Sequence, residues 1–569
     1  MKTKKFLLAA LTAMCAMTMT VSMTSCTNDI SDNPVINPEP DEPEEDLADA
    51  TIMWYGHGGG NVDAAIFEDF RQFYKAKTES FKRVNVVAQY KASLNPTIYK
   101  EYTDEQIAEA ADSLAEGKTE EELENMDADS YFVLFHPQRG ATYRFLVDSR
   151  KTLRQQMLET EPYGEPNCDF TCPDSLTNFI NWAAKTYPAK KYILVMADHG
   201  GGYLPDEDLA DAAATRGMVF DDGHNNKCFS AKSFARGVRN ANVRPEGVVL
   251  YLCLMNNIEF LYDVKDVTDY VTCSTYVMWG GGGTLYTIVD DMAEGKDTET
   301  TLAHFVDSNV DHWDSDFYHP EETEEEEWPL YYDLTMTKTS RLNDLALVLR
   351  EFTDRLVDTY QNGTPEQREA IDFCTANAVK VENTSPFYDF AKYMTSFFAV
   401  LPDVFDEDLF NRLADAFNAC IVKQRYSRYL TEHNYMVDYS VMLAVRGAYV
   451  KYVYDKGFGG DAQLVGAVVF YPDGTGAAYN YKANGEDSSD GSLDNYELVA
   501  EGTWPSTFAE TYQQTTFDRL VGWSRWLLIN ESAPPAWSPS TFNFQLPSDD
   551  MSGNPMNGRR GVRHLCVCI

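Results

Sequence analysis

Val248-Val249-Leu250-Tyr251-Leu252-Cys253-Leu254-Met255-Asn256-Asn257 is the stretch that decides the fold. It is an apolar run of strand length, rich in β-branched residues at its start, which stops at Cys253 and gives way to a helical pattern. Buried parallel strands carry near-continuous apolar runs of this kind. Because α/β enzymes act at the edge where such strands end, Cys253 is the first candidate functional residue.

A second stretch of the same kind lies upstream, where the apolar residues 192–197 are followed by Asp198-His199-Gly200-Gly201-Gly202. If the two strands are neighbours in one parallel sheet, His199 and Cys253 reach the same edge together. A thiol nucleophile needs a base beside it, and an imidazole suits that role. The two strand ends therefore predict a Cys/His catalytic pair.

The predicted pair suits attack on a carbonyl carbon. A cysteine thiol with a pKa of about 8.5 is mostly protonated at neutral pH, so the His199 imidazole would take its proton and return it to a leaving amine. The backbone N–H groups of Gly200, Gly201 and Cys253 are candidates to hold the oxyanion, because backbone without side chains can face a substrate. Taken alone, a cysteine or a histidine at a strand end is more often structural, but the two together favour an enzyme.

Short apolar strands and amphipathic helices alternate over the first half of the chain. The strand patterns lie at 51–55, 217–222 and 270–274, and the helix patterns at 64–77 and 173–187. This alternation predicts an α/β fold with a mostly parallel sheet flanked by helices. Residues 131–135 and 141–147 read as a hairpin. The glycines at 280–283 would let the backbone approach a ligand closely or hinge over it.

A second histidine follows the first predicted strand, in Gly56-His57-Gly58-Gly59-Gly60. The motif resembles the oxyanion loop of lipase-type hydrolases, which works with a serine in a Gly-x-Ser-x-Gly turn. The chain contains no such serine motif. An esterase is therefore disfavoured, and His57 is assigned to a loop beside the sheet edge, where it can line the cleft.

The bulk composition bounds the class of protein. The chain has 569 residues, of which 44% are hydrophobic, so it can bury a large core and form more than one domain or subdomain. Its formal net charge of -42 argues against nucleic acid or an anionic membrane as the main partner, because those partners require clustered Lys and Arg. We expect a monomer that acts on a protein or peptide.

The N-terminus indicates export. A basic start at residues 1–5 is followed by an apolar segment to about Val21, too short to span a bilayer, and by small residues before Cys26. This pattern is typical of a bacterial lipoprotein signal, with Cys26 as the lipid-bearing first residue of the mature protein; the alternative is an ordinary secretory signal with an incidental cysteine. We expect the protein in the cell envelope, held to the membrane only by its lipid and exposed at the surface.

The cysteines and the acidic run 321–327 are the remaining candidate sites in the sequence. Of the 11 cysteines, nine lie beyond the signal region, and an odd number in an exported protein suggests a free thiol, for which Cys253 is the candidate. Cys168 and Cys172 are close enough in sequence to form a disulfide. The acidic run 321–327 lacks the ligand spacing of a dedicated calcium loop, so calcium is only weakly supported and we expect no cofactor.

The residues also resemble a known family, the clostripain-like cysteine peptidases. The resemblance rests on the segment 187–192 leading into His199-Gly200, the preceding helix with Leu176, Phe179 and Trp182, the pair Asp221-Asp222, and Cys253-Leu254-Met255 followed by Glu259. Tyr270 through the glycine run, Phe470-Tyr471-Pro472 and Trp523 continue it over roughly residues 50–530.

The resemblance implies a caspase-like fold, with Cys253 as nucleophile and His199 as general base. It also implies cleavage after Arg or Lys, and processing of the enzyme's own chain between His199 and Cys253. The acidic, alanine-rich loop 204–216 is the expected processing site, and Arg216 the expected residue before the cut.

Two departures from the family pattern concern the specificity pocket. The family has an Asp where this chain has Tyr251, and a tyrosine supplies no buried negative charge at neutral pH, which weakens the expectation of cleavage after Arg or Lys. Ser274 is followed by Thr275 where the family has a Glu. The first hypothesis is a cysteine endopeptidase of altered specificity, and the alternative is a catalytically inactive surface lipoprotein that binds peptide or protein in the same cleft.

Together these interpretations divide the chain into five segments. We expect a lipoprotein signal peptide at 1–25, an acidic flexible tether at 26–49, a caspase-like peptidase core at 50–300, a C-terminal helical-plus-strand region at 301–530 and a loosely ordered tail at 531–569.

Overall fold

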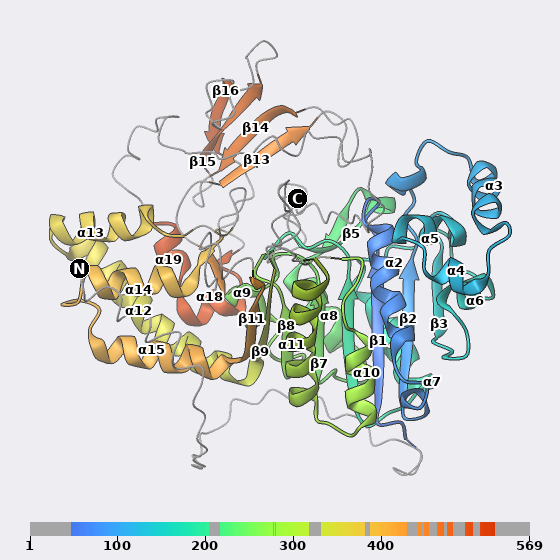
Figure 1. Cartoon of the computed structure of the whole chain (residues 1–569). Coiled ribbons are helices and arrows are strands. Elements are labelled where there is room, and N and C mark those ends of the chain that lie inside the picture. The colour runs from blue at the N-terminus through green and yellow to red at the C-terminus, as the bar shows by residue number, and fades with distance from the viewer. Residues whose placement is uncertain are drawn as a thin grey trace.

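Figure 1 shows the computed structural model of the chain. It describes residues 47–203, 217–276, 278, 280–317, 332–379, 381, 387–428, 441–444 and 512–529, and the backbone of four further strands between 449 and 503. The expected signal peptide, Cys26, nearly all of the tether, the loop 204–216 with Arg216, the acidic run 321–327 and the tail lie outside the described residues. Within the described residues no helix is both long enough and apolar enough to cross a membrane.

An eight-stranded sheet forms the centre of the molecule, in the order β11-β9-β8-β7-β4-β1-β2-β3. Its five central strands are parallel, and the three outer strands are antiparallel to their neighbours. The parallel strands are β1 (Ala50–His57), β2 (Val84–Lys91), β4 (Tyr192–Ala197), β7 (Gly247–Tyr251) and β8 (Tyr270–Cys273), and the outer strands are β3 (Thr142–Leu146), β9 (Asp333–Lys338) and β11 (Ile421–Tyr426). The predicted α/β fold with a mostly parallel sheet is confirmed.

Helices cover both faces of this sheet, which explains why β1, β4 and β7 are buried along their whole length and are mostly apolar. Figure 1 shows α2, α10 and α11 in front of the strands, while α7 and α8 pack against each other on the other side. Their bounds are α2 (Asp63–Arg71), α7 (Pro173–Thr186), α8 (Ala231–Arg239), α9 (Ile258–Asp263), α10 (Tyr286–Ala293) and α11 (Thr298–Phe317).

The connections leave the centre of the sheet in opposite directions. The chain passes from β1 outward to β2, whereas from β4 it passes the other way to β7 and then β8. The point between β1 and β4 is therefore a topological switch point, and ligands of open α/β sheets bind outside the carboxyl ends of strands at such a point. The carboxyl ends of β1, β4 and β7 are thus the expected place for an active site.

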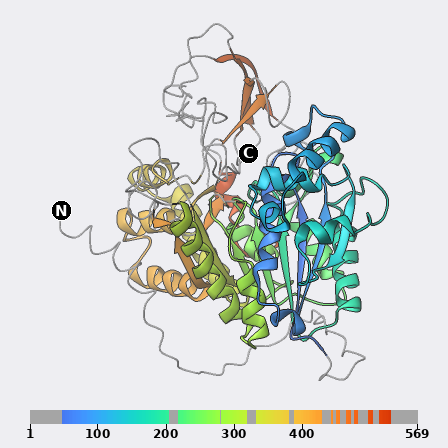
Figure 2. The same cartoon turned by 45° about the vertical axis from the view of Figure 1, so that its right-hand side comes forward.

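Residues beyond 300 complete the sheet and add a helical cluster. β9 and β11 extend the sheet, and the helices pack beside its β11 edge, at the end of the molecule away from the helices α3 to α6 (Figures 1 and 2). The helices of this cluster are α12 (Leu342–Asn362), α13 (Pro365–Ala376), α14 (Phe390–Val400), α15 (Glu407–Cys420), α18 (Thr516–Val521) and α19 (Ser524–Leu527).

The remaining described elements are small. The acidic insert after β2 forms α3 (Asp104–Ala115) and α4 (Glu120–Glu124), followed by α5 (Ala128–Phe135) and α6 (Leu153–Leu158). Two-stranded pairs are formed by β5 (Met218–Asp221) with β6 (Lys227–Phe229), and by β10 (Phe387–Asp389) with β12 (Met442–Ala444). A separate four-stranded antiparallel sheet contains β13 (Tyr449–Tyr454), β14 (Leu464–Phe470), β15 (Thr475–Tyr481) and β16 (Tyr496–Thr503).

The predicted hairpin before α6 is wrong in its first half. Residues 131–135 belong to the helix α5, whose N-cap Asp127 accepts a hydrogen bond from the backbone N–H of Ser130. Residues 142–146 do form a strand, β3, but it pairs with β2 rather than with a preceding hairpin strand. A short aromatic run fits either element by periodicity, and here the cap and the packing of Phe132 and Phe135 against Phe67 select the helix.

Candidate active site

His199 and Cys253 lie side by side at the carboxyl edge of the sheet. β4 and β7 are adjacent and parallel, and Ala197 of β4 pairs with Tyr251 of β7. His199 and Cys253 each follow two residues after this pair, so both leave the sheet at the same level. The backbones remain in contact past the strand ends, because a Cβ atom placed on Gly200 would lie 2.0 Å from the carbonyl oxygen of Cys253. Only glycine fits at position 200, and its absence of a side chain is what allows the two segments to approach.

The His199 ring is held by a residue from the first strand. Its Nε2 lies 2.6 Å from Oδ1 of Asn61, in the turn that connects β1 to α2. With the amide oxygen as acceptor, Nε2 carries the proton, so Nδ1 is left with the lone pair that a general base requires. Asn61 was not predicted as a functional residue, and its place just after a strand end and a glycine run is the only signal of it in the sequence.

The glycine run before Asn61 packs directly on the His199 ring. Gly59 has a positive φ of 55°, and a Cβ atom there would lie 2.9 Å from both Cδ2 of His199 and Oδ1 of Asp198. A side chain at position 59 would therefore displace the imidazole as well as strain the turn. The motif that resembled an oxyanion loop instead supports the histidine of the candidate pair.

Asp198 fixes the backbone on either side of the candidate base. Its Oδ1 accepts a hydrogen bond of 2.6 Å from the backbone N–H of His199, and its Oδ2 accepts one of 2.9 Å from that of Phe220. The side chain is buried, and burial raises the pKa of this carboxyl well above its usual range, with the His57 charge opposing the shift. Asp198 thus connects β4 to the segment that follows the loop 204–216.

Burial also decides the charge of His199. The side chain is 3% exposed, and this desolvation lowers the pKa of its imidazole to about 4; the Cys253 thiol opposes the shift, and the His57 charge adds to it. Since burial disfavours the charged form of the imidazole, His199 is neutral at pH 7. A neutral imidazole is the form that can accept a proton from a thiol.

Cys253 is covered in this conformation. The residue is 1% exposed, and its Sγ lies 3.4 Å from the backbone nitrogen of Met278, which donates to it. The next residue, Leu254, has a φ of 60°, in the left-handed region that costs a residue with a side chain about 1 kcal/mol or more. The turn at Cys253 is therefore strained, and Met278 in the segment after β8 covers the thiol.

Of the predicted oxyanion donors, one is already occupied. The backbone N–H of Gly201 donates to the carbonyl oxygen of Gly217 at 2.9 Å, and Val219 N–H donates to the oxygen of His199 at 3.1 Å. The backbone of residues 199–202 thus lies alongside that of residues 217–219, which follow the loop 204–216 in the sequence. In this conformation the Gly201 N–H would have to exchange its partner before it could hold an oxyanion.

The three predicted specificity residues are buried in two separate networks. The hydroxyl of Tyr251 lies 3.1 Å from the carbonyl oxygen of Gly282 and 3.2 Å from Oδ1 of Asn309. The Ser274 hydroxyl and the Thr275 backbone N–H both donate to Asp333 at the start of β9, at 2.9 and 3.0 Å. Tyr251 therefore contacts the glycine run 280–283, whereas Ser274 and Thr275 contact Asp333, the first residue of β9.

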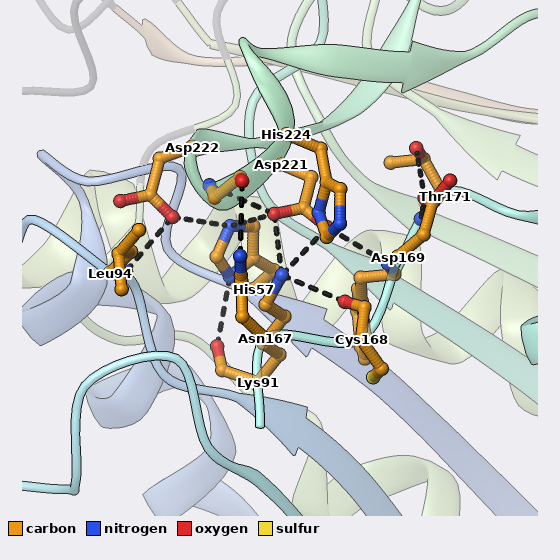
Figure 3. A network of polar contacts seen from close by, with 12 residues as sticks. His57, Lys91, Leu94, Asn167, Cys168, Asp169, Thr171, Asp221, Asp222 and His224 are labelled. Atoms are coloured by element: carbon orange, nitrogen blue, oxygen red, sulfur yellow. Dashed lines mark hydrogen bonds and ion pairs between the residues drawn. The ribbon is translucent and has the colours of Figure 1, made fainter. Parts of the chain in front are cut away.

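The prediction of a loop position for His57 is wrong, because His57 is the last residue of β1 and lies in a buried ionic cluster (Figure 3). Its Nδ1 donates to the carbonyl oxygen of Lys91 at 2.9 Å, and its Nε2 faces Oδ1 of Asp222 at 3.4 Å. Burial lowers the pKa of the His57 imidazole, but the carboxylates of Asp222, Asp198 and Asp221 outweigh it and raise the pKa to about 9. His57 is thus a buried cation at neutral pH, and it does not line the site.

The same cluster was tested as a metal site. His57, Asp221 and Asp222 have ligand atoms close enough to share an ion. The Lys91 ammonium, however, already lies 2.6 and 2.7 Å from the two oxygens of Asp221 (Figure 3). A metal ion would have to lie against the Lys91 ammonium, and His57 would first have to lose its proton to bind it, so these residues do not fit one. Cys168 and Cys172 are both free, so the suggested disulfide between them is wrong.

Comparison with known proteins gives a family match over most of the chain. A sequence profile of the clostripain family matches residues 155–497, a range that includes His199 and Cys253. Clostripain of Hathewaya histolytica is 28% identical over 135 residues, which cover 22% of this chain and 25% of that protein. The chain thus aligns with about a quarter of the length of this curated relative.

Several solved structures are similar to the chain. A secreted C11 cysteine protease of Bacteroides thetaiotaomicron called iotapain matches with a TM-score of 0.43 and 16% identity, over 67% of this chain and 88% of that one. A C11 protease of the same organism in complex with an irreversible peptide inhibitor matches with a TM-score of 0.47 and 12% identity, over 84% and 100%. An inactive zymogen C11 protease of Parabacteroides distasonis matches with a TM-score of 0.44 and 14% identity, over 84% and 98%.

Proposed function

The chain belongs to the clostripain family, and from this premise we propose that it is a cysteine endopeptidase in which Cys253 attacks the peptide bond and His199 acts as the base. The observation that carries the proposal is the register of β4 and β7, which brings both residues to the same edge of the sheet beside the switch point. Family membership adds the substrate class, a protein or peptide.

The proposed mechanism follows from the protonation state of His199. Nδ1 takes the proton of the Cys253 thiol as Sγ forms a bond to the carbonyl carbon and the carbonyl electron pair moves to oxygen. The backbone N–H groups of Cys253 and Gly200, and of Gly201 once it is released from Gly217, are the donors proposed for this oxyanion. Collapse breaks the C–N bond, and the amine leaves with the proton from His199. Water then hydrolyses the thioester by the same route and frees Cys253.

Asn61 is proposed to position the imidazole. Its hydrogen bond to Nε2 holds the ring with the unprotonated Nδ1 available for the thiol, and it stabilises the imidazolium that forms during attack. Asn61 does not touch the reacting atoms, so it is a positioning residue. The short turn from β1 fixes its place, and Gly59 allows that turn to contact the ring.

Two changes are proposed to activate the site: movement of Met278, which covers the thiol, and processing of the chain beside His199. Cys253 is 1% exposed, so a substrate cannot reach Sγ in the described conformation. Gly202 and Gly217, which flank the loop 204–216 in the sequence, lie together beside the candidate base, because Gly217 N–H donates to the oxygen of Gly202. A cut after Arg216 would release residues 217–219 from residues 199–202 and free the Gly201 N–H for the oxyanion.

The cellular location is also a proposal. The basic start, the short apolar segment and Cys26 support export and lipid attachment at the cell envelope, with the acidic residues that follow as a tether. Incorporation of labelled palmitate into the wild-type chain, and its absence from a Cys26→Ser variant, would be expected. Equal incorporation in both chains would contradict lipid attachment at Cys26.

Turnover of peptides tests the proposed activity. A mixture of peptides with every residue type before the scissile bond is incubated with the wild-type chain and with Cys253→Ala and His199→Ala variants, and the products are read by mass spectrometry. We expect internal cleavage by the wild type only. Tight binding of peptides without cleavage would favour the alternative, an inactive lipoprotein that binds peptide.

A further inference from the structure

We propose that Asn257 is a positioning residue for the nucleophile: its side-chain amide holds the left-handed turn at Leu254 and thereby sets the direction in which Cys253 presents its thiol. This inference rests on the proposed peptidase function and adds a residue to the same site. Asn257 is fully buried and lies at the end of the loop that joins β7 to α9.

The turn at Leu254 is the strained point of this loop. Its φ of 60° lies in the left-handed region, where the Cβ atom of a residue with a side chain crowds the following carbonyl oxygen. Leucine has no polar side chain to stabilise this conformation locally, so the turn persists only because its surroundings determine it. Backbone outliers of this kind cluster at active sites, and this one directly follows the proposed nucleophile.

Hydrogen bonds hold both polar groups of the Leu254 backbone. Its N–H donates to the carbonyl oxygen of Tyr276 at 2.8 Å, in the segment after β8. Its carbonyl oxygen accepts a buried hydrogen bond of 2.7 Å from Nδ2 of Asn257. The backbone N–H of Asn257 also donates back into the turn, to the oxygen of Met255 at 2.9 Å. Asn257 thus closes the turn on its carboxyl side with both its side chain and its backbone.

The Asn257 side chain does not cap the helix that it precedes. Asn257 occupies the N-cap position of α9, where an asparagine oxygen commonly accepts a hydrogen bond from the first turn, but no such side-chain bond is present. Its Oδ1 is buried without a hydrogen-bond partner within the described residues, while Nδ2 donates to Leu254. The opposite orientation of the amide would place two acceptor oxygens against each other. The bond to Leu254 is therefore the one for which the amide is oriented.

The chain is anchored on both sides of the turn. Before the turn, β7 pairs with β4 as far as Tyr251. After it, the N–H of Asn256 donates to the oxygen of Ser274 at 3.0 Å, and the oxygen of Asn256 accepts from the N–H of Met442 at 2.8 Å, at the start of β12. The residues that carry the nucleophile therefore join two fixed points, and the conformation of Leu254 decides the path between them.

A shift of the turn would move the reacting groups of Cys253. The carbonyl of Cys253 and the N–H of Leu254 belong to one planar peptide unit, so they move together. That carbonyl packs on the segment of the base, since a Cβ atom placed on Gly200 would lie 2.0 Å from its oxygen. A different φ at Leu254 would carry this peptide, and with it the thiol and the N–H of Cys253, away from His199. The side chain of Asn257 bonds to Leu254 rather than to a reacting atom, so it acts through the turn.

A double-mutant cycle tests the inference. Turnover of a peptide that the wild type cleaves is measured for Asn257→Ala, Leu254→Gly and the double variant, and urea unfolding of each chain is followed in parallel. Glycine adopts a positive φ without support, so it makes the bond from Asn257 dispensable. We expect Asn257→Ala to lower kcat about 30-fold in the wild-type background with KM nearly unchanged, and by less than about threefold in the Leu254→Gly background.

Asn125→Ala is the matched control for the loss of an amide donor. The Asn125 side chain also donates to a backbone carbonyl oxygen at 2.7 Å, that of Glu121, but it is exposed at the end of α4. This variant should keep the kcat and KM of the wild type in both backgrounds.

Two results would overturn the inference while the peptidase proposal stands: a wild-type kcat in Asn257→Ala, or an equal fall in kcat in both backgrounds, which would show that Asn257 does not act through the turn. If Asn257→Ala does not fold, Asn257→Asp keeps the shape of the side chain without the amide donor and should show the same dependence on the residue at position 254. If Leu254→Gly does not fold, Leu254→Asn replaces it, because asparagine also adopts left-handed conformations. If the wild type cleaves no peptide, the peptidase proposal fails and this inference fails with it.

Discussion

At the scale of single residues, the account depends on how three side chains from different strands divide the work. In the proposed mechanism Cys253 supplies the sulfur and His199 the base, and the hydrogen bond from Nε2 to Asn61 in the β1 turn orients the ring. Burial of His199 keeps the imidazole neutral, which is the state required before attack. Each of these roles predicts a separate result.

Removal of the Asn61 amide should reduce turnover without unfolding the protein. We expect Asn61→Ala to lower kcat about 100-fold, because the ring loses its orientation and the imidazolium its stabilising partner. KM should remain nearly unchanged, since Asn61 does not touch the substrate. Asn362→Ala, an exposed asparagine at the end of α12, is the control and should behave as wild type. A KM effect with unchanged kcat would contradict a positioning role.

The pH dependence of catalysis should reflect the buried state of His199. Protonation removes the base, so kcat/KM falls as pH drops through the pKa of His199, which burial lowers to about 4. We expect the acid limb of the profile near pH 4 rather than near 6.5, the ordinary value for histidine. Circular dichroism at each pH separates titration from unfolding. An acid limb near pH 6.5 with the fold intact would show that His199 is hydrated in the active enzyme.

At the scale of elements, the β5–β6 pair is tied to the sheet by charges with no access to water. Lys91 on β2 and Asp221 at the end of β5 are both fully buried, and Asp221 also accepts hydrogen bonds from the backbone N–H groups of Phe170 and Gly223. This connection holds the segment that follows the processing loop against β1 and β2. It therefore fixes residues 217–220, which contact the backbone of Asp198 and His199.

Loss of the Asp221 carboxylate should destabilise the protein strongly. We expect Asp221→Ala to lower the free energy of unfolding by about 3–5 kcal/mol, because the Lys91 ammonium is left buried without its partner. Urea unfolding followed by tryptophan fluorescence measures the change. Glu294→Ala, which removes an ion pair with Lys77 at the surface, is the control and should barely move the midpoint. Similar small effects of both substitutions would show that water reaches the cluster.

The elements also show what the sequence could and could not predict. The strands that carry His199 and Cys253 were predictable because buried parallel strands have continuous apolar runs, and the structure confirms the mostly parallel sheet. The contact of Asn61 with the His199 ring was not, since it depends on β1 lying beside β4. Local pattern also failed at residues 131–135, where a capped helix replaced the predicted strand.

At the scale of the whole molecule, the described conformation is closed. The thiol is covered by the segment after β8, and residues 217–219 pair with the backbone beside His199. Activation therefore has to change contacts made by two segments that lie far apart in the sequence. The loop 204–216 is the segment whose cleavage would release the second of them.

Cleavage within that loop should accompany activity. We expect purified active enzyme to consist of two fragments, with a new N-terminus at Gly217, and Arg216→Ala to remain largely a single chain with reduced turnover. Cys253→Ala should stay intact, because the cut is made by the enzyme itself. N-terminal sequencing and denaturing electrophoresis read the result. A fully active single chain would contradict activation by processing.

Covalent labelling of Cys253 is the sharpest test of whether the chain is a cysteine peptidase. The wild-type chain and Cys253→Ala are incubated with acyloxymethyl ketone probes that carry Arg, Lys or norleucine, and the site of attachment is located by peptide mass spectrometry. The account predicts one adduct per chain, on Cys253, which is lost in Cys253→Ala and much slower in His199→Ala. Absence of labelling by every probe, with the protein folded and peptide bound, would contradict it and identify a binding protein that retains only the fold of a peptidase.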